Sequence, residues 1–124
     1  MNADKYQVLA MRTNDGRCTE RLIEFIEKHP ELDVGGIVNG SYGLSGESGE
    51  LNDYIKKAIF HKHPLDMKAI EKEISDCCWY LALMCDSFGF HLGEIMKLNI
   101  DKLKARYPEG FSEERSQHRA KDDI

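Results

Sequence analysis

DMKAIEKEISDCCWYLALMCDSF, residues 66–88, is the stretch of this sequence that decides the fold. Its apolar residues recur mainly at spacings of three and four, the pattern that one face of an α-helix produces. They are Ile70, Ile74, Cys77, Cys78, Leu81, Met84, Cys85 and Phe88. Asp66 can cap the first turn, and Gly89 follows the last residue of the pattern. The sequence therefore predicts an amphipathic helix from Asp66 to Phe88.

The segment before this helix predicts a second one, from about Val38 to Phe60. Apolar residues lie on one face of it, namely Leu44, Leu51, Ile55 and Ile59. Four glycines in the segment each cost such a helix up to about 1 kcal/mol relative to alanine, so neighbouring elements must hold it. They are Gly40, Gly43, Gly46 and Gly49. Because glycines three apart share a ridge of the helix, another backbone or a ligand can approach there.

The outer parts of the chain complete an all-α protein. A third helix is predicted from Leu92 to Lys104, closed by Pro108-Glu109-Gly110. Asp4 to Thr13 and Thr19 to His29 read as two short helices or one broken helix, followed by a loop over Glu31–Gly36. Short connections favour an antiparallel four-helix bundle spanning residues 1–111, and residues 112–124 are too polar to order as an independent element.

Charge and hydropathy exclude several classes of partner. Asp and Glu outnumber Lys and Arg by 22 to 17, a formal charge of -5, so the chain lacks the positive field that nucleic-acid binding requires. No apolar run reaches membrane-spanning length, and residues 1–5 are too polar to begin a secretory signal. We expect a cytoplasmic protein that contacts neither nucleic acid nor membrane.

The cysteines and histidines indicate no zinc site. The cysteines contain no Cys-x-x-Cys pair, and three of the four fall in the helix of residues 66–88, so reduced core thiols are expected. His61 and His63 form a His-x-His pair that could hold a metal at an interface, but a solvated loop is the better interpretation.

Two pairs of carboxylates carry the chemistry. Glu47 and Glu50 lie on the second predicted helix, and Glu73 and Asp76 on the helix of residues 66–88. A spacing of three puts both members of a pair on one helix face, and each pair borders apolar residues of its helix. Four carboxylates can therefore face one another between two packed helices.

A divalent cation would relieve the repulsion within such a cluster. All-oxygen ligation selects hard ions, Mg²⁺ first and Mn²⁺ next. The alternative, solvated acids on helix surfaces, has equal weight on physical grounds alone. A di-iron bundle needs Glu-x-x-His pairs, and the chain has none. A non-catalytic nucleotide-binding or oligomerisation module remains a rival interpretation.

The motifs around these acids resemble those of a known family. Gly43-Leu44-Ser45-Gly46-Glu47-Ser48-Gly49-Glu50-Leu51, Lys56-Lys57 and Glu73-Ile74-Ser75-Asp76 look like the Glu-Glu-x-x-Glu and Glu-x-x-Asp signature of MazG-like nucleotide pyrophosphohydrolases. Asn99, Lys102, and the run Arg106-Tyr107-Pro108-x-Gly110-Phe111 extend the resemblance over residues 40 to 111. Gly46 departs from it, since the family usually has a glutamate there, which puts a second metal ion in doubt.

The resemblance implies a function for each part of the site. Glu47, Glu50, Glu73 and Asp76 would ligate Mg²⁺, and the reaction would be hydrolysis of a nucleoside or deoxynucleoside triphosphate between its α and β phosphates, for nucleotide-pool sanitation or control. Glu47 or Glu50 would accept the proton of the attacking water. The family also implies a homodimer or a homotetramer built as a dimer of dimers.

Further residues are candidates for substrate binding. They are Lys57, Tyr80, Asn99, Lys102, Arg106 and Tyr107. The cations would contact phosphate oxygens, the Asn99 amide a sugar or base, and Tyr80 a base, although each can also be an ordinary structural residue. Trp79 is expected to pack in the core.

Overall fold

The computed structural model describes residues 2–119, which contain helices and no strand. Their order is α1 (Ala3–Ala10), the 3-10 helix η1 (Met11–Thr13), α2 (Cys18–Lys28), α3 (Val34–Phe60), α4 (Met67–Phe88), α5 (Leu92–Arg106) and α6 (Glu113–Gln117). The all-α class is confirmed. The chain divides into two compact units, Met1–Val34 and Gly35–Ile124.

The first unit consists of short helices with local caps. The Asn2 side chain accepts a hydrogen bond from the backbone N–H of Lys5 at 2.8 Å and so begins α1. Gly16, at φ 73°, makes the turn between η1 and α2, and its N–H is bonded to the Asn14 side chain. The predicted first region is therefore two separate helices. All four large apolar residues of α2 are exposed, namely Leu22, Ile23, Phe25 and Ile26.

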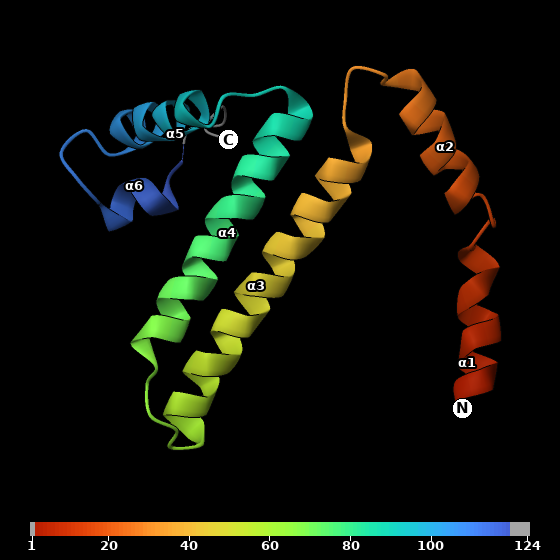
Figure 1. Cartoon of the computed structure of the whole chain (residues 1–124), viewed down its shortest axis with the longest axis horizontal. Coiled ribbons are helices and arrows are strands. Elements are labelled where there is room, and N and C mark those ends of the chain that lie inside the picture. Colours follow the sequence, from red (N-terminus) through yellow and green to blue (C-terminus); the bar gives the residue numbers. More distant parts are fainter. Residues whose placement is uncertain (1, 120–124) are drawn as a thin grey trace. The chain divides into compact units, whose positions relative to one another are not determined.

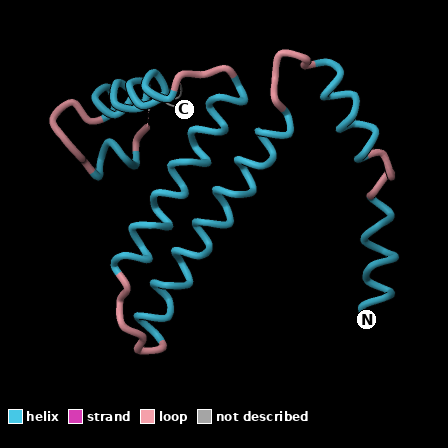
Figure 2. Tube along the Cα trace, viewed as in Figure 1, coloured by secondary structure: helices cyan, strands magenta, loops and turns pink. Residues whose placement is uncertain are grey.

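The second unit is organised around α3 and α4, which run antiparallel and side by side (Figure 1). α4 begins and ends as the sequence predicts: Asp66 accepts a hydrogen bond from the N–H of Ala69, and Gly89 takes the left-handed conformation at φ 74°. A short connection then leads into α5, which contacts α4 (Figure 2).

Two glycines allow α3 to approach α4 closely. A Cβ added at Gly40 would lie 2.5 Å from Cγ of Met84, and one at Gly43 would lie 2.1 Å from Cε1 of Tyr80. Nothing would lie within 4 Å of a Cβ at Gly46 or Gly49. Of the four glycines on the predicted ridge, Gly40 and Gly43 thus allow helix packing, whereas Gly46 and Gly49 face open space.

Several expectations about helix boundaries are wrong. α3 begins at Val34, so residues 34–36 of the predicted loop are helical, because packing of this region, with Val34 buried, overrides the low helix preference of its glycines. α5 continues two residues beyond Lys104 to Arg106. The predicted four helices are six α-helices in the described residues, since the first region is split and Ser112 caps the short helix α6.

The apolar core is smaller than expected. Among residues 2–119, Val34 is the only buried apolar side chain, apart from glycines. Trp79 is 59% exposed, so its predicted place in the core is wrong. The cysteines are free, as predicted, but Cys18 and Cys78 are exposed rather than buried. Each unit, taken by itself, therefore leaves large apolar side chains exposed.

No described helix is both long enough and apolar enough to span a membrane. The assignment of residues 1–111 to one domain and 112–124 to a polar tail stays a prediction, and residues 120–124 lie outside the described part.

Candidate metal centre

Three of the four predicted carboxylates converge between α3 and α4. One carboxylate oxygen from each of Glu47, Glu73 and Asp76 lies within 4.8 Å of the others. Glu47 comes from α3, and Glu73 and Asp76 come from successive turns of α4. We call these three residues the acid trio. The close approach of α3 to α4 at Gly43, one turn before Glu47, brings the two helices near enough for this contact.

The three carboxyl groups of the trio are partly buried, so they interact strongly with one another. Glu73 is only 4% exposed, and Glu47 and Asp76 are half-buried. A hydrogen bond with the Glu73 carboxyl raises the pKa of Glu47, and so do partial burial and repulsion from Glu50, Asp76 and Glu73. Two carboxyl groups can share a hydrogen bond only if one of them holds a proton. The raised pKa means that Glu47 keeps its proton to a higher pH than an isolated carboxyl group would, and a bound cation would compete with that proton.

Glu50 lies beside the trio and not within it. Its charge contributes to the raised pKa of Glu47, but it is exposed and belongs to a shallow pocket of about 420 Å³ on α3. That pocket is lined by Gly46, Gly49, Glu50, Asp53, Tyr54 and Lys57. Because Gly46 and Gly49 have no side chains, the surface next to Glu50 is open to a ligand.

Asp53 and Tyr54 are members of this pocket that the sequence analysis did not identify. Asp53 forms ion pairs with Lys57 and, at 2.9 Å, with Lys56. These bonds, the one from Lys57 first, lower the pKa of Asp53 to about 2, and Asp53 in turn raises the pKa of Lys57. The spacing of four between Asp53 and Lys57 was the available signal. Lys57 therefore reaches the pocket already paired with a carboxylate.

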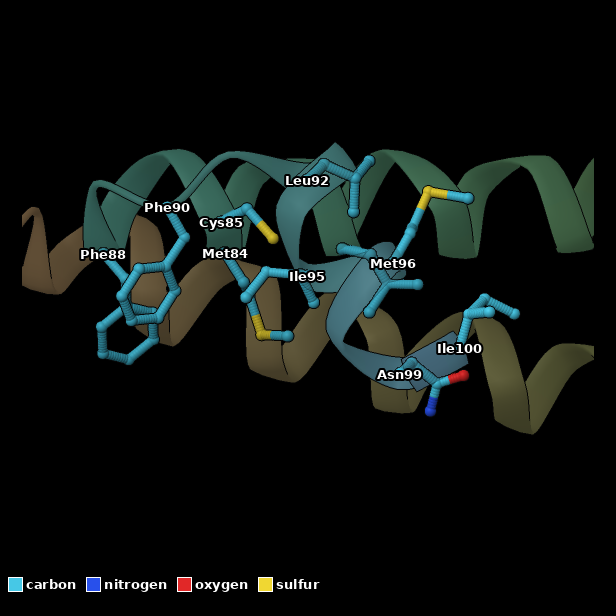
Figure 3. Close-up of a pocket in the computed structure, with 10 residues that line it drawn as sticks. Met84, Cys85, Phe88, Phe90, Leu92, Ile95, Met96, Asn99 and Ile100 are labelled. Atoms are coloured by element: carbon cyan, nitrogen blue, oxygen red, sulfur yellow. The ribbon is translucent and has the colours of Figure 1, made fainter. Parts of the chain in front are cut away.

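The remaining predicted substrate residues lie elsewhere in the second unit. Tyr80 packs its ring against Gly43 and edge-on to Trp79, with ring centroids 5.1 Å apart. Asn99 borders a separate, apolar groove between α4 and α5 (Figure 3). Lys102 and Arg106 lie on α5, and Tyr107 follows its last residue, with its ring 5.5 Å from that of Phe111. None of these side chains belongs to the acid trio.

Comparison with family models decides the assignment. The model of the MazG nucleotide pyrophosphohydrolase domain matches residues 41–111, more than half of the 124-residue chain. The chain belongs to the MazG family. The MazG match covers most of α3 and all of α4 and α5. It therefore includes all three residues of the acid trio. Searches of curated proteins and of solved structures give no match.

Family membership confirms the resemblance seen in the motifs and indicates a nucleotide pyrophosphohydrolase. The trio is a set of oxygen ligands able to hold a metal ion. It has no histidine or cysteine, and its oxygens lie near enough to share one cation. The donor set fits a hard divalent ion.

Proposed function

We propose that this protein is a magnesium-dependent pyrophosphohydrolase that splits nucleoside or deoxynucleoside triphosphates between the α and β phosphates, for nucleotide-pool sanitation or control. The observation that carries the proposal is the convergence of Glu47, Glu73 and Asp76 within 4.8 Å in a MazG chain. Like charges this close repel one another, and partial burial reduces the screening by water. Such mutual repulsion among carboxylates is expected at a site that binds a cation.

Glu47, Glu73 and Asp76 would hold Mg²⁺, or Mn²⁺ in its place, with Glu50 as a fourth ligand or as the proton acceptor. When bound, such an ion neutralises polyphosphate charge and lowers the pKa of a coordinated water. Glu73 is the most buried of the four acids, so its proposed role is to fix the position of the site.

Glu47 or Glu50 is the proposed general base. The chain must supply one carboxylate that accepts the proton of the attacking water. Glu50 is the better placed of the two, because it stands outside the trio and is exposed in the pocket on α3. Glu47 would be committed to the cation.

Lys57 is the proposed contact for phosphate oxygens, since it lines the same pocket as Glu50. When a phosphate binds there, Lys57 would exchange part of its ion pair with Asp53 for an ion pair with the phosphate. Asn99, Lys102, Arg106 and Tyr107 are proposed substrate contacts on the strength of the family motif, and Tyr80 remains a candidate for contact with the base. The groove beside Asn99 is otherwise apolar, so its amide would be the polar contact there.

A homodimer or a dimer of dimers is the proposed assembly. It is supported by the exposure of large apolar side chains along the described helices of each unit. Exposed apolar patches are typical of protein–protein interaction surfaces.

The test is turnover of a nucleotide panel with Mg²⁺, with pyrophosphate and orthophosphate measured separately. We expect monophosphate and pyrophosphate, and loss of turnover in Asp76→Asn and Glu50→Gln. Glu71→Gln is the matched control, because Glu71 is an exposed acid on α4 outside the trio. Release of orthophosphate would indicate another class of hydrolase.

Binding is measured in parallel by thermal unfolding with Mg²⁺ and a non-hydrolysable triphosphate. A rise in the unfolding temperature that Asp76→Asn removes and Glu71→Gln retains is the expected result. Nucleotide-dependent stabilisation without turnover of any nucleotide would favour a binding module over an enzyme. No nucleotide-dependent shift at all would contradict the proposal.

A further inference from the structure

Lys57 can bind a phosphate beside the metal centre only if its ammonium group lies in a defined place. A lysine side chain is long and flexible, and on a helix surface it samples many rotamers. The Lys57 side chain is 43% exposed, yet it lines the pocket on α3 together with Glu50. A fixed position for its ammonium group therefore needs a second side chain that binds it.

Asp53 supplies that second side chain. Its Oδ2 forms an ion pair with Nζ of Lys57, and its Oδ1 forms one with Nζ of Lys56 at 2.9 Å. An acid placed four residues before a lysine is the favourable order for an ion pair on a helix. Hydrogen bonds from Lys57 and then Lys56 lower the pKa of Asp53 to about 2, and Asp53 raises the pKa of Lys57. Both partners are therefore charged at neutral pH.

The ion pair with Asp53 directs Lys57 toward Glu50. Along the axis of α3, Asp53 lies about 4.5 Å beyond Glu50, and Lys57 about 10.5 Å beyond it. Side chains on a helix lean toward its N-terminus, and the bond to Asp53 fixes the Lys57 ammonium on that side of its own Cα. The positive charge is thus held about one helical turn from Glu50 rather than two.

Lys56 keeps this arrangement positive. Asp53 carries one negative charge and pairs with two ammonium groups, so the three side chains together retain one positive charge. The Lys57 ammonium has three N–H donors, and Asp53 engages one of them. The remaining donors and the net charge suit a phosphate oxygen. Lys56 is outside the lining of the pocket, so it offsets the charge of Asp53 without occupying the position of the phosphate.

We propose that Asp53 is a positioning residue, which acts through Lys57 to hold a substrate phosphate beside Glu50 and the acid trio. The inference rests on the proposed function, in which Lys57 contacts phosphate. Asp53 does not itself bind the substrate, because its carboxylate repels phosphate. Removing the carboxylate therefore has two separate effects: it removes a repulsion, which favours binding, and it frees the Lys57 side chain, which removes the orientation that turnover requires.

Steady-state kinetics distinguishes these two effects. Asp53→Asn is expected to lower kcat about tenfold or more, because an error of about 1 Å in the position of a reacting group costs up to about 100-fold in rate. The KM of this variant should stay equal or fall, since binding in the ground state is intact. Asp53→Glu, which keeps a carboxylate four residues before Lys57, should retain most of the kcat. Asp101→Asn is the matched control, because Asp101 forms an exposed ion pair of the same spacing with Lys97 on α5.

A double variant tests whether Asp53 acts through Lys57. In a Lys57→Met background, which has lost the ammonium group, Asp53→Asn is expected to have no further effect on kcat. A structural role of Asp53 in α3 would instead lower kcat equally in both backgrounds. The proposal would be overturned by an undiminished effect in Lys57→Met, by a rise in KM in Asp53→Asn, or by an Asp53→Glu variant as impaired as Asp53→Asn.

A readout without turnover separates this inference from the proposed function. The Lys57 ammonium signal, assigned with Lys57→Arg, is measured by NMR with Mg²⁺ and saturating inorganic tripolyphosphate. An ammonium group held by hydrogen bonds exchanges its protons slowly with water, so we expect a sharp signal in the parent and in Asp53→Glu, and a broadened one in Asp53→Asn. A chain with this pattern that hydrolyses no nucleotide would refute the proposed function and retain the positioning role. A sharp signal in Asp53→Asn, or none in the parent, would overturn the positioning role whatever the turnover.

Discussion

Alanine at Gly43 and alanine at Gly46 are expected to change stability in opposite directions, although both residues lie within α3. An added Cβ at Gly46 meets nothing within 4 Å. The variant should therefore gain helix preference, up to about 1 kcal/mol. At Gly43 the same Cβ would lie 2.1 Å from Cε1 of Tyr80, where ordinary contact begins at 3.4 Å, so the ring or the helix must move by 1.3 Å.

The difference between the two variants follows from that displacement. The gain in helix preference is common to both, so it cancels in the comparison. Forcing an extra methyl group into a packed contact typically costs 1–3 kcal/mol, which gives about 2 kcal/mol in favour of Gly46→Ala. For a chain of this size about 2 kcal/mol corresponds to roughly 8 °C in the unfolding temperature.

Thermal unfolding followed by circular dichroism at equal protein concentrations measures this difference. Gly40→Ala is an informative third variant, because the atom nearest its Cβ is Cγ of the flexible Met84 side chain. It should fall between the other two. If Gly43→Ala unfolds at the same temperature as Gly46→Ala or above it, then α3 and α4 do not approach each other at Tyr80 as described.

Three further predictions concern buried polar groups of α4 and the trio. Glu73→Gln is expected to raise the unfolding temperature in EDTA, because it removes a buried like charge, and to abolish the rise caused by Mg²⁺; Glu71→Gln should do neither. The raised pKa of Glu47 stabilises the metal-free chain at low pH, and this contribution is lost as pH rises through that pKa. Above the ordinary carboxyl pKa, rising pH should therefore destabilise the parent in EDTA relative to Glu47→Gln, and an identical pH dependence of the two would refute the assignment. Ser87→Ala should stabilise the chain by about 1 kcal/mol in urea unfolding, because the Ser87 hydroxyl is buried without a hydrogen-bond partner.

The sequence predicted helices well where local signals coincided. α4 was predicted within one residue because its periodicity, the Asp66 cap and Gly89 all agree. The start of α3 was missed because its first turn contains Gly35 and Gly36, which locally favour a loop. Trp79 was misplaced for a different reason. Periodicity shows that a position is apolar or aromatic, but not whether the same chain supplies the neighbours that cover it.

The metal centre was predicted in part for a geometric reason. A spacing of three correctly put Glu73 and Asp76 on one face of α4, and the same spacing on α3 suggested that Glu47 and Glu50 act together. Residues three apart on a helix still differ by about 60° in direction and 4.5 Å along the axis. The line of contact with α4 passes nearer to Glu47, so Glu50 lies in the open pocket instead. Which of two such neighbours meets the other helix depends on how the two helices cross. The sequence alone does not specify that crossing.

The packing of α3 on α4 explains how a repulsive cluster can be tolerated at a helix contact. Glu73 and Asp76 face Glu47 across the contact with α3, so without a cation their charges oppose the packing of the two helices. On neighbouring turns, Gly43 lies against Tyr80 and Gly40 against Met84, and these contacts hold the two helices together. The stabilising contacts and the metal ligands therefore lie on different turns of the same two helices. A cation that relieves the repulsion then stabilises a helix contact that these glycines have already made possible.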